Sequence, residues 1–270
     1  MDTELKPSTR VFDRIVCGVD GTPESLEAAR QAERLRSPEG SLRLATVAEV
    51  NTAVHAGWAM SHVLDELDAS ARVALDRAID EIPAASSHLV SGDTLPSLLD
   101  ELRQQEATLV AVGPRGRSRA VGMLLGGVAT GLLHDAPCSV LLARTPQFGE
   151  FPVSIVAGVD GSEHSLVAAT VAKSIADRFG SELVIVAATG GKRVDLGAIE
   201  AFPSEYVTDP RTAVAALVDL SNEADLLVVG SRGLHGPVAL GSVSERVGHR
   251  AASSVVVVRD LQGGNHEHPR

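Results

Sequence analysis

The chain has 270 residues, a formal net charge of −11 and only 3% aromatic residues. The negative charge disfavours a general nucleic-acid binder or a protein attracted to anionic membranes, because both kinds of binding depend on spread positive charge. The scarcity of aromatic rings also disfavours stacking on single-stranded nucleic acid, whereas a local site for a phosphorylated small molecule remains compatible with this composition.

The sequence favours a cytoplasmic protein. Residues 1–13 are charged and lack a hydrophobic signal core. No apolar run approaches the roughly 18 residues needed to span a bilayer. Cys17 and Cys138 fall in predicted strands without metal-ligand spacing, so we expect buried thiols in a reducing compartment.

In the first half of the chain, apolar runs alternate with amphipathic segments. Predicted strands cover residues 14–20, 42–47, 88–91, 109–112 and 139–143. A hydroxyl residue followed by proline, Thr22-Pro23, predicts the start of the first helix, and we expect Gly40 to stop it. Further predicted helices cover about 57–82 and 95–105, and a last one follows Gly126.

The second half repeats this order. Residues 15–21 match residues 155–161 at an offset of 140, and Gly113 matches Gly230 at an offset of 117. The second copy therefore lacks 140 − 117 = 23 residues, which we assign to its long second helix. Its predicted strands are 154–160, 183–187, 206–207, 226–229 and 254–259, and its predicted helices include 165–179 and 213–220.

Continuous apolar strands that alternate with helices predict α/β domains with doubly wound parallel sheets of five strands each. We expect a first domain over residues 10–146, a shortened second domain over 152–260 and a flexible tail over 261–270. The segment 145–152, with two prolines, is the expected linker.

Each half carries a glycine-bearing loop between an apolar strand and a helix. Such a loop lets backbone N–H groups approach an anion, and the helix N-terminus adds aligned donors. Ligands of open α/β sheets bind beyond the carboxyl ends of the strands, so Asp20 and residues 113–116 converge if their strands are neighbours. Asp20 then suits the sugar or base end of a nucleotide, because a carboxylate repels phosphate. It could equally form the turn or cap the helix, and Asp160 in the second copy does not decide this.

These motifs resemble tandem universal stress proteins of the nucleotide-binding kind, over about residues 14–144 and 154–259. The resemblance rests on the Val-Asp-Gly-Thr/Ser turn at 19–22 and 159–162 and on the family pattern of Gly, two residues, Gly, nine residues, Gly, then Ser or Thr. It implies Rossmann-like domains of the adenine nucleotide alpha hydrolase type, binding of ATP with or without Mg²⁺, and pairing of the two units through their last strands. A homodimer and a protein partner are further implied possibilities.

The two halves keep different parts of the pattern. In the first half the spacing is kept, but Gly127 occupies the hydroxyl position. In the second half Ser242 and Ser244 are present, but only seven residues, instead of nine, separate Gly233 from Gly241. We expect the first half to be the better site, because a shortened loop moves several donors together. The candidate binding residues are Asp20, Val47, Gly113, Arg115, Gly116, Gly126, Gly127 and Val128, and in the second half Asp160, Gly230, Arg232, Gly233, Gly241, Ser242 and Ser244.

The expected function is that of a non-catalytic, ATP-binding regulatory protein of the stress response, with no catalytic and no metal-ligating residues. One alternative is a degenerate pair that acts only through protein contacts. The other is a slow ATP hydrolase, against which the absence of Asp and Glu between Gly113 and Gly131 counts. No P-loop and no nucleophile elbow occurs in the sequence.

Overall fold

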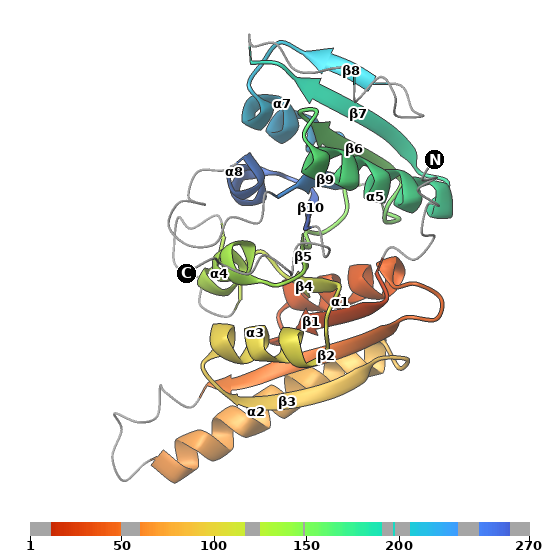
Figure 1. The fold of residues 1–270 in the computed structure, drawn as a ribbon. Helices are drawn as coiled ribbons and strands as arrows, with labels where there is room; N and C mark the ends of the chain where they lie inside the picture. The colour runs from red at the N-terminus through yellow and green to blue at the C-terminus, as the bar shows by residue number, and fades with distance from the viewer. Residues whose placement is uncertain are drawn as a thin grey trace, which may run out of the picture.

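The computed structural model describes residues 12–49, 60–116, 125–147, 149–190, 197, 206–231 and 243–259. Within these residues, ten strands form a single sheet in the order β3-β2-β1-β4-β5-β10-β9-β6-β7-β8 (Figure 1). The strands are β1 (Arg14–Gly18), β2 (Ser41–Glu49), β3 (Ser86–Gly92), β4 (Leu109–Val112), β5 (Ser139–Leu142), β6 (Ser154–Val159), β7 (Glu182–Ala188), β8 (Tyr206–Asp209), β9 (Leu226–Gly230) and β10 (Ser254–Val258).

Helices cover both faces of this sheet. They are α1 (Pro23–Leu35), α2 (Met60–Glu81), α3 (Thr94–Gln104), α4 (Gly127–Asp135), α5 (Glu163–Phe179), α7 (Ala213–Leu220) and α8 (Val243–Arg250). One core cluster joins α1, α2 and α5 to the sheet, and a second joins α3, α4, α7 and α8. Both clusters consist mainly of Ala, Val, Leu and Ile, as the shortage of aromatic residues requires.

The alternation of strands and helices gives the predicted doubly wound α/β fold. In the amino-terminal half, which ends with β5, strand β1 pairs in parallel with both β2 and β4. In the carboxy-terminal half, which begins with β6, strand β6 pairs in parallel with both β7 and β9. Strands β4, β5 and β10 are buried along their whole length, which explains why their sequences are continuous apolar runs rather than alternating ones.

The two halves join through their last strands. β5 and β10 run antiparallel, with Leu142 opposite Val255 and Val140 opposite Val257. The two expected five-stranded sheets are therefore one continuous sheet, and the pairing implied by the family resemblance takes place within this chain. The edge that the last strand of each half would expose is covered by the other half.

The end of the first helix differs from the sequence prediction. Helix α1 ends at Leu35, and the chain turns away at Arg36 (φ −59°, ψ 133°) rather than at Gly40. Gly40 serves a different purpose, because a Cβ at this position would lie 2.7 Å from the carbonyl oxygen of Asp13. Its lack of a side chain allows two backbone segments to meet before β2 begins.

Some predictions fall on residues that the structure does not describe. The loss of the second helix in the carboxy-terminal half concerns residues 191–205, of which the structure describes only Gly197, and the tail 261–270 also lies outside the described residues. Among the helices that are described, none is long and apolar enough to cross a membrane.

Candidate functional site

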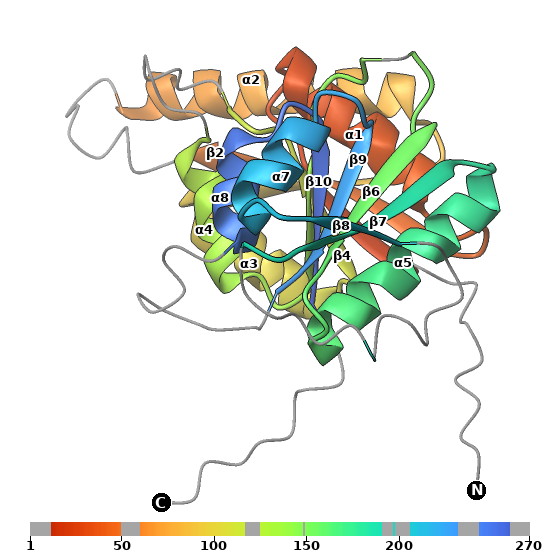
Figure 2. The ribbon, with the colours of Figure 1, turned by 90° about the horizontal axis from the view of Figure 1, so that it is seen from above.

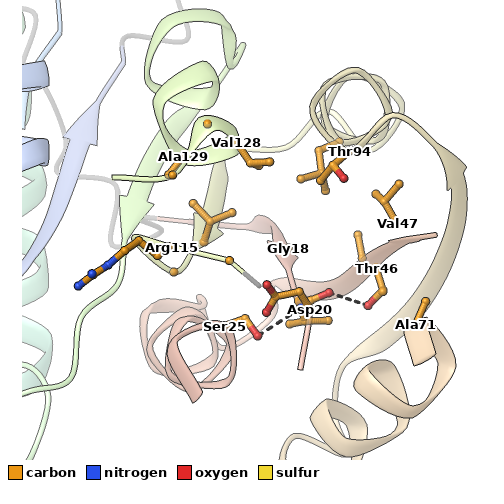
Figure 3. Close-up of a pocket in the computed structure, with 18 of the residues that line it drawn as sticks. Gly18, Asp20, Ser25, Thr46, Val47, Ala71, Thr94, Arg115, Val128 and Ala129 are labelled. Carbon is orange, nitrogen blue, oxygen red and sulfur yellow. Dashed lines mark hydrogen bonds between the residues drawn. The ribbon is translucent and has the colours of Figure 1, made fainter. Parts of the chain in front are cut away.

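A cavity of about 350 Å³ opens at the carboxyl ends of β1 and β4, between helices of the amino-terminal half (Figure 3). Its volume lies within the range of small-molecule sites, which is roughly 300–1,000 Å³. Because β1 and β4 are neighbours, the turn after β1 and the loop after β4 meet here. All eight first-half residues singled out from the sequence line this cavity: Asp20, Val47, Gly113, Arg115, Gly116, Gly126, Gly127 and Val128.

Asp20 forms the turn that starts α1. Its Oδ1 accepts hydrogen bonds from the backbone N–H (3.0 Å) and the hydroxyl (2.6 Å) of Thr22. Thr22 in turn caps the helix, because its Oγ1 accepts from the N–H of Ser25 at 3.2 Å. Asp160 and Ser162 repeat the arrangement before α5, with distances of 3.0 and 2.5 Å. The capping role therefore explains why both copies carry Asp, and in the first copy this same side chain also lines the cavity.

The glycines of the loop fall into two groups. A Cβ at Gly113 would lie 2.9 Å from the backbone carbonyl carbon of Glu24, and one at Gly116 would lie 2.9 Å from Oδ2 of Asp20. By contrast, a Cβ at Gly126 would meet nothing closer than 3.6 Å, and one at Gly127 would meet nothing within 4 Å. The backbone of α1 thus leaves no room for a side chain at Gly113, and a side chain at Gly116 would displace the carboxylate of Asp20, whereas the space around Gly127 is open.

Helix α4 points its N-terminus at the cavity. Gly126 is its N-cap and, having no side chain, makes no side-chain capping hydrogen bond. The N–H of Gly126 donates to the carbonyl oxygen of Pro114 at 2.8 Å, which ties the helix start to the loop after β4. The first N–H groups of a helix have no partner within the helix. Here they border the cavity at Gly127, Val128 and Ala129, an arrangement that suits an anion.

The opposite end of the cavity is less polar. Val47 of β2 lines it together with Ala71 of α2 and Leu98 of α3. Thr46 beside Val47 is buried, and its hydroxyl donates to the carbonyl oxygen of Val19 at 2.8 Å, which holds the ends of β1 and β2 together. The cavity thus offers an apolar end, a carboxylate in the middle and backbone N–H groups at the far end.

Sequence reasoning did not single out several other lining residues, among them Ala71, Thr94 and Leu98. Thr94 begins α3 directly after β3, so the rule that sites lie beyond the carboxyl ends of strands would have found it. Ala71 and Leu98 sit on apolar helix faces, and such positions carry no signal that separates a pocket wall from the core.

The side chain of Arg115 is directed elsewhere. In Figure 3 its guanidinium group points away from Asp20 and from the cavity, and the residue is exposed. Burial, together with the positive charge of Arg115, lowers the pKa of Arg144 to about 10. The two guanidinium groups therefore repel each other near the junction of the halves. In this conformation Arg115 contributes its backbone to the cavity wall, and the expected phosphate contact of its side chain stays a prediction.

The carboxy-terminal half keeps the same framework. Asp160 follows β6 and Gly230 ends β9, and these strands are neighbours. A Cβ at Gly230 would lie 2.4 Å from the carbonyl oxygen of His164, so Gly230 has the same packing role as Gly113. Ser244 is buried in α8. Arg232, Gly233, Gly241 and Ser242 lie outside the described residues, so the ranking of the two halves stays a prediction.

Within the described residues, no group of three or more His, Cys, Asp or Glu side chains could hold a metal ion. Mg²⁺ is a hard cation that is held by carboxylates and phosphate oxygens. The cavity wall described here supplies one carboxylate, that of Asp20. A bound Mg²⁺ would therefore have to be held mainly by the ligand's phosphates.

Comparison with known proteins gives a consistent result. A model described as "Universal stress protein family" matches residues 12–144 and 187–259. Universal stress protein Rv2623 of Mycobacterium tuberculosis (strain ATCC 25618 / H37Rv) is 29% identical over 91% of this chain and 96% of its own length. Universal stress protein Rv2005c of the same strain is 31% identical over 65% of this chain and 69% of its own length.

Solved structures agree on the fold. A universal stress protein from Archaeoglobus fulgidus DSM 4304 superposes with a TM-score of 0.74 at 21% identity, covering 94% of this chain and 98% of its own. A protein described as a putative universal stress protein, from Pseudomonas aeruginosa UCBPP-PA14, gives a TM-score of 0.65 at 19% identity, covering 93% and 94% of the two chains.

Proposed function

This chain belongs to the universal stress protein family, and we propose that its amino-terminal half is a regulatory site that binds an adenine nucleotide without turning it over. The observation that carries the proposal is the N-terminus of α4. Its N-cap residue Gly126 has no side chain, and its first turn borders a cavity that it shares with Asp20. ATP is the nucleotide that the family resemblance implies.

The proposed pose follows from the chemistry along the cavity. The adenine ring lies at the apolar end beside Val47 and Ala71, near the carboxyl end of β2. The ribose hydroxyls donate to Asp20, which keeps the carboxylate away from the phosphates. The phosphates lie against Gly126, Gly127 and Val128, where helix N–H groups and the helix dipole favour negative charge.

A binding role fits this wall better than a catalytic one. Phosphoryl transfer requires an oriented nucleophile and, as a rule, carboxylates that hold a metal near the phosphates. The segment from Gly113 to Gly131 contains neither Asp nor Glu. We therefore propose that occupancy of the site, and not hydrolysis, is the signal, and that residues 10–146 and 152–260 are the two domains across which it acts. Location in the cytoplasm and assembly into a homodimer stay predictions from the sequence.

Calorimetric titration of the full chain with ATP, combined with an assay of phosphate release, tests this proposal. We expect saturable binding and no release above the buffer rate. Steady ATP turnover that depends on the protein would favour the hydrolase alternative. If titration with ATP, ADP or adenosine gives no binding heat, a degenerate member that acts only through protein contacts is favoured.

A further inference from the structure

Helix α4 connects the cavity to the junction between the halves. It has nine residues and is therefore roughly 13 Å long. Its N-terminus borders the cavity, and its C-terminus lies on the side of the carboxy-terminal half, next to α8 (Figures 1 and 2). A Cβ at Gly248 of α8 would lie 3.1 Å from the side chain of Leu133, so the two helices are in close contact.

The C-terminus of α4 is held by an arginine from the other half. The guanidinium group of Arg259, which directly follows β10, donates from one nitrogen to the carbonyl oxygen of Leu133 at 2.5 Å and from another to that of Ala136. The backbone N–H of Arg259 donates to Oγ of Ser139 at 3.1 Å. Arg259 is only 8% exposed, and burial lowers its pKa. A buried cation is thus placed at the last carbonyl groups of α4, where the helix dipole is negative.

The sequence of α4 makes such support necessary. Its nine residues include Gly127 and Gly131, and glycine in a helix costs about 1 kcal/mol relative to alanine. Short helices are marginal by themselves and depend on tertiary contacts. Gly131 cannot be replaced freely, because a Cβ there would lie 2.2 Å from the side chain of Leu95 in α3. Contacts at the ends of α4 therefore help to decide how firmly its first turn is placed.

We propose that Arg259 of the carboxy-terminal half is a positioning residue for the phosphate end of the amino-terminal site. By fixing the last turn of α4, it fixes the direction of the N–H groups of the first turn, and its charge adds to the attraction of phosphate along the helix. The inference rests on the proposed nucleotide site and extends it. The amino-terminal site is complete only when the carboxy-terminal half is docked.

The internal symmetry of the chain suggests a reciprocal contact. Arg144 lies 259 − 144 = 115 residues before Arg259 and donates to the carbonyl oxygens of Gly248 (2.5 Å) and Ser253 (3.1 Å) at the end of α8. Arg144 is unsuitable as a control, however, because it interacts electrostatically with Arg115, a residue that lines the cavity. Arg34 is suitable: its Nε donates to the carbonyl oxygen of Phe151 at 3.0 Å and it lies over the ring of Phe179, so it joins the halves without contacting α4.

The experiment compares Arg259→Met, Arg259→Lys and Arg34→Met in the full chain by titration with ADP and with adenosine. We expect Arg259→Met to weaken ADP binding roughly threefold to tenfold, the range of a helix-end charge in a partly buried setting. Its adenosine binding should be unchanged, since adenosine does not reach α4. Arg259→Lys should recover most of the loss, and Arg34→Met should bind both ligands like the unaltered chain.

Hydrogen exchange of the α4 amides provides a readout that needs no ligand. In Arg259→Met they should exchange faster than in Arg34→Met. The inference is overturned if ADP binding of Arg259→Met is unchanged, if ADP and adenosine lose affinity equally, or if Arg34→Met behaves in the same way. If the unaltered chain binds neither ligand, the proposed function itself fails, and that outcome is distinct from the others.

Discussion

Asp20 and Gly116 come from the ends of different strands, yet a Cβ at Gly116 would lie 2.9 Å from Oδ2 of Asp20. The other carboxylate oxygen, Oδ1, is engaged by the N–H and hydroxyl of Thr22. One side chain therefore stabilises the turn before α1 and borders the cavity. Asp20 therefore has two roles that an experiment can separate: the capping role seen in the structure and the ligand-binding role that we propose.

The matched pair Asp20→Ala and Asp160→Ala tests that separation. Both variants should lose roughly 1 kcal/mol of unfolding free energy, because each removes the acceptor that orders a capped helix start. Only Asp20→Ala should weaken binding of both adenosine and ADP, by about tenfold or more, the value of a hydrogen bond to a charged group. Chemical denaturation and calorimetric titration measure the two effects. Equal nucleotide affinity in the two variants would leave Asp20 with the capping role alone.

Gly127→Ser should strengthen nucleotide binding. The space around Gly127 is open, and this is the position at which the family pattern has a hydroxyl residue. A serine hydroxyl there can donate to a phosphate, and one added hydrogen bond should improve ADP affinity roughly threefold to tenfold. Adenosine affinity should stay the same. Gly127→Ala is the control, because it adds the Cβ without the hydroxyl, and an equal gain in both variants would contradict the explanation.

Gly113→Ala should destabilise the protein. The added Cβ would press against the backbone of Glu24, which cannot move without shifting α1. Overpacking of this kind costs about 1–3 kcal/mol. Gly127→Ala serves again for comparison, since its Cβ meets nothing within 4 Å and alanine is the better helix former. Urea denaturation of the two variants gives the answer, and equal stability would show that the loop after β4 yields easily.

The two thiols should be unreactive in the folded protein. Cys17 and Cys138 are fully buried. Burial raises the pKa of the Cys17 thiol, with a further contribution from the negative charge of Asp20. Burial also raises the pKa of Cys138 to about 12. A thiol reagent such as Ellman's reagent at pH 8 should label neither residue in the native protein and both in denaturant, and rapid native labelling would contradict this burial.

The same shifts give a direction for the pH dependence of stability. Thiols of the unfolded chain ionise near pH 9, whereas Cys138 in the folded chain keeps its proton up to about pH 12. The folded state therefore binds more protons between these values, and the free energy of unfolding should fall as the pH rises above about 9.

Local sequence signals predicted much of this structure. Apolar runs such as residues 109–112 gave the strands, and Thr22-Pro23 gave the start of α1 together with its capping residue. Repetition of the Asp20 turn at Asp160 gave the tandem arrangement. The family resemblance added the junction through β5 and β10, which no periodicity in the chain indicates.

Contacts between residues far apart in the chain could not be predicted from the sequence. Arg259 and Leu133 are 259 − 133 = 126 residues apart, and only the register of β5 against β10 brings them together. The direction of the Arg115 side chain and the role of Gly40 likewise depend on residues that are close in space but distant in the sequence. Local patterns specify helices, strands and turns, whereas the contacts that hold the two ends of α4 arise from tertiary packing.

The central claim is that an adenine nucleotide binds in the amino-terminal half with its phosphates on the first turn of α4. A crystal structure of the full chain grown with saturating ADP tests it most directly. We predict electron density with adenine beside Val47, ribose hydroxyls on Asp20 and phosphates over Gly126 and Gly127. An empty cavity at saturating ADP, or a nucleotide bound only in the carboxy-terminal half, would contradict the account.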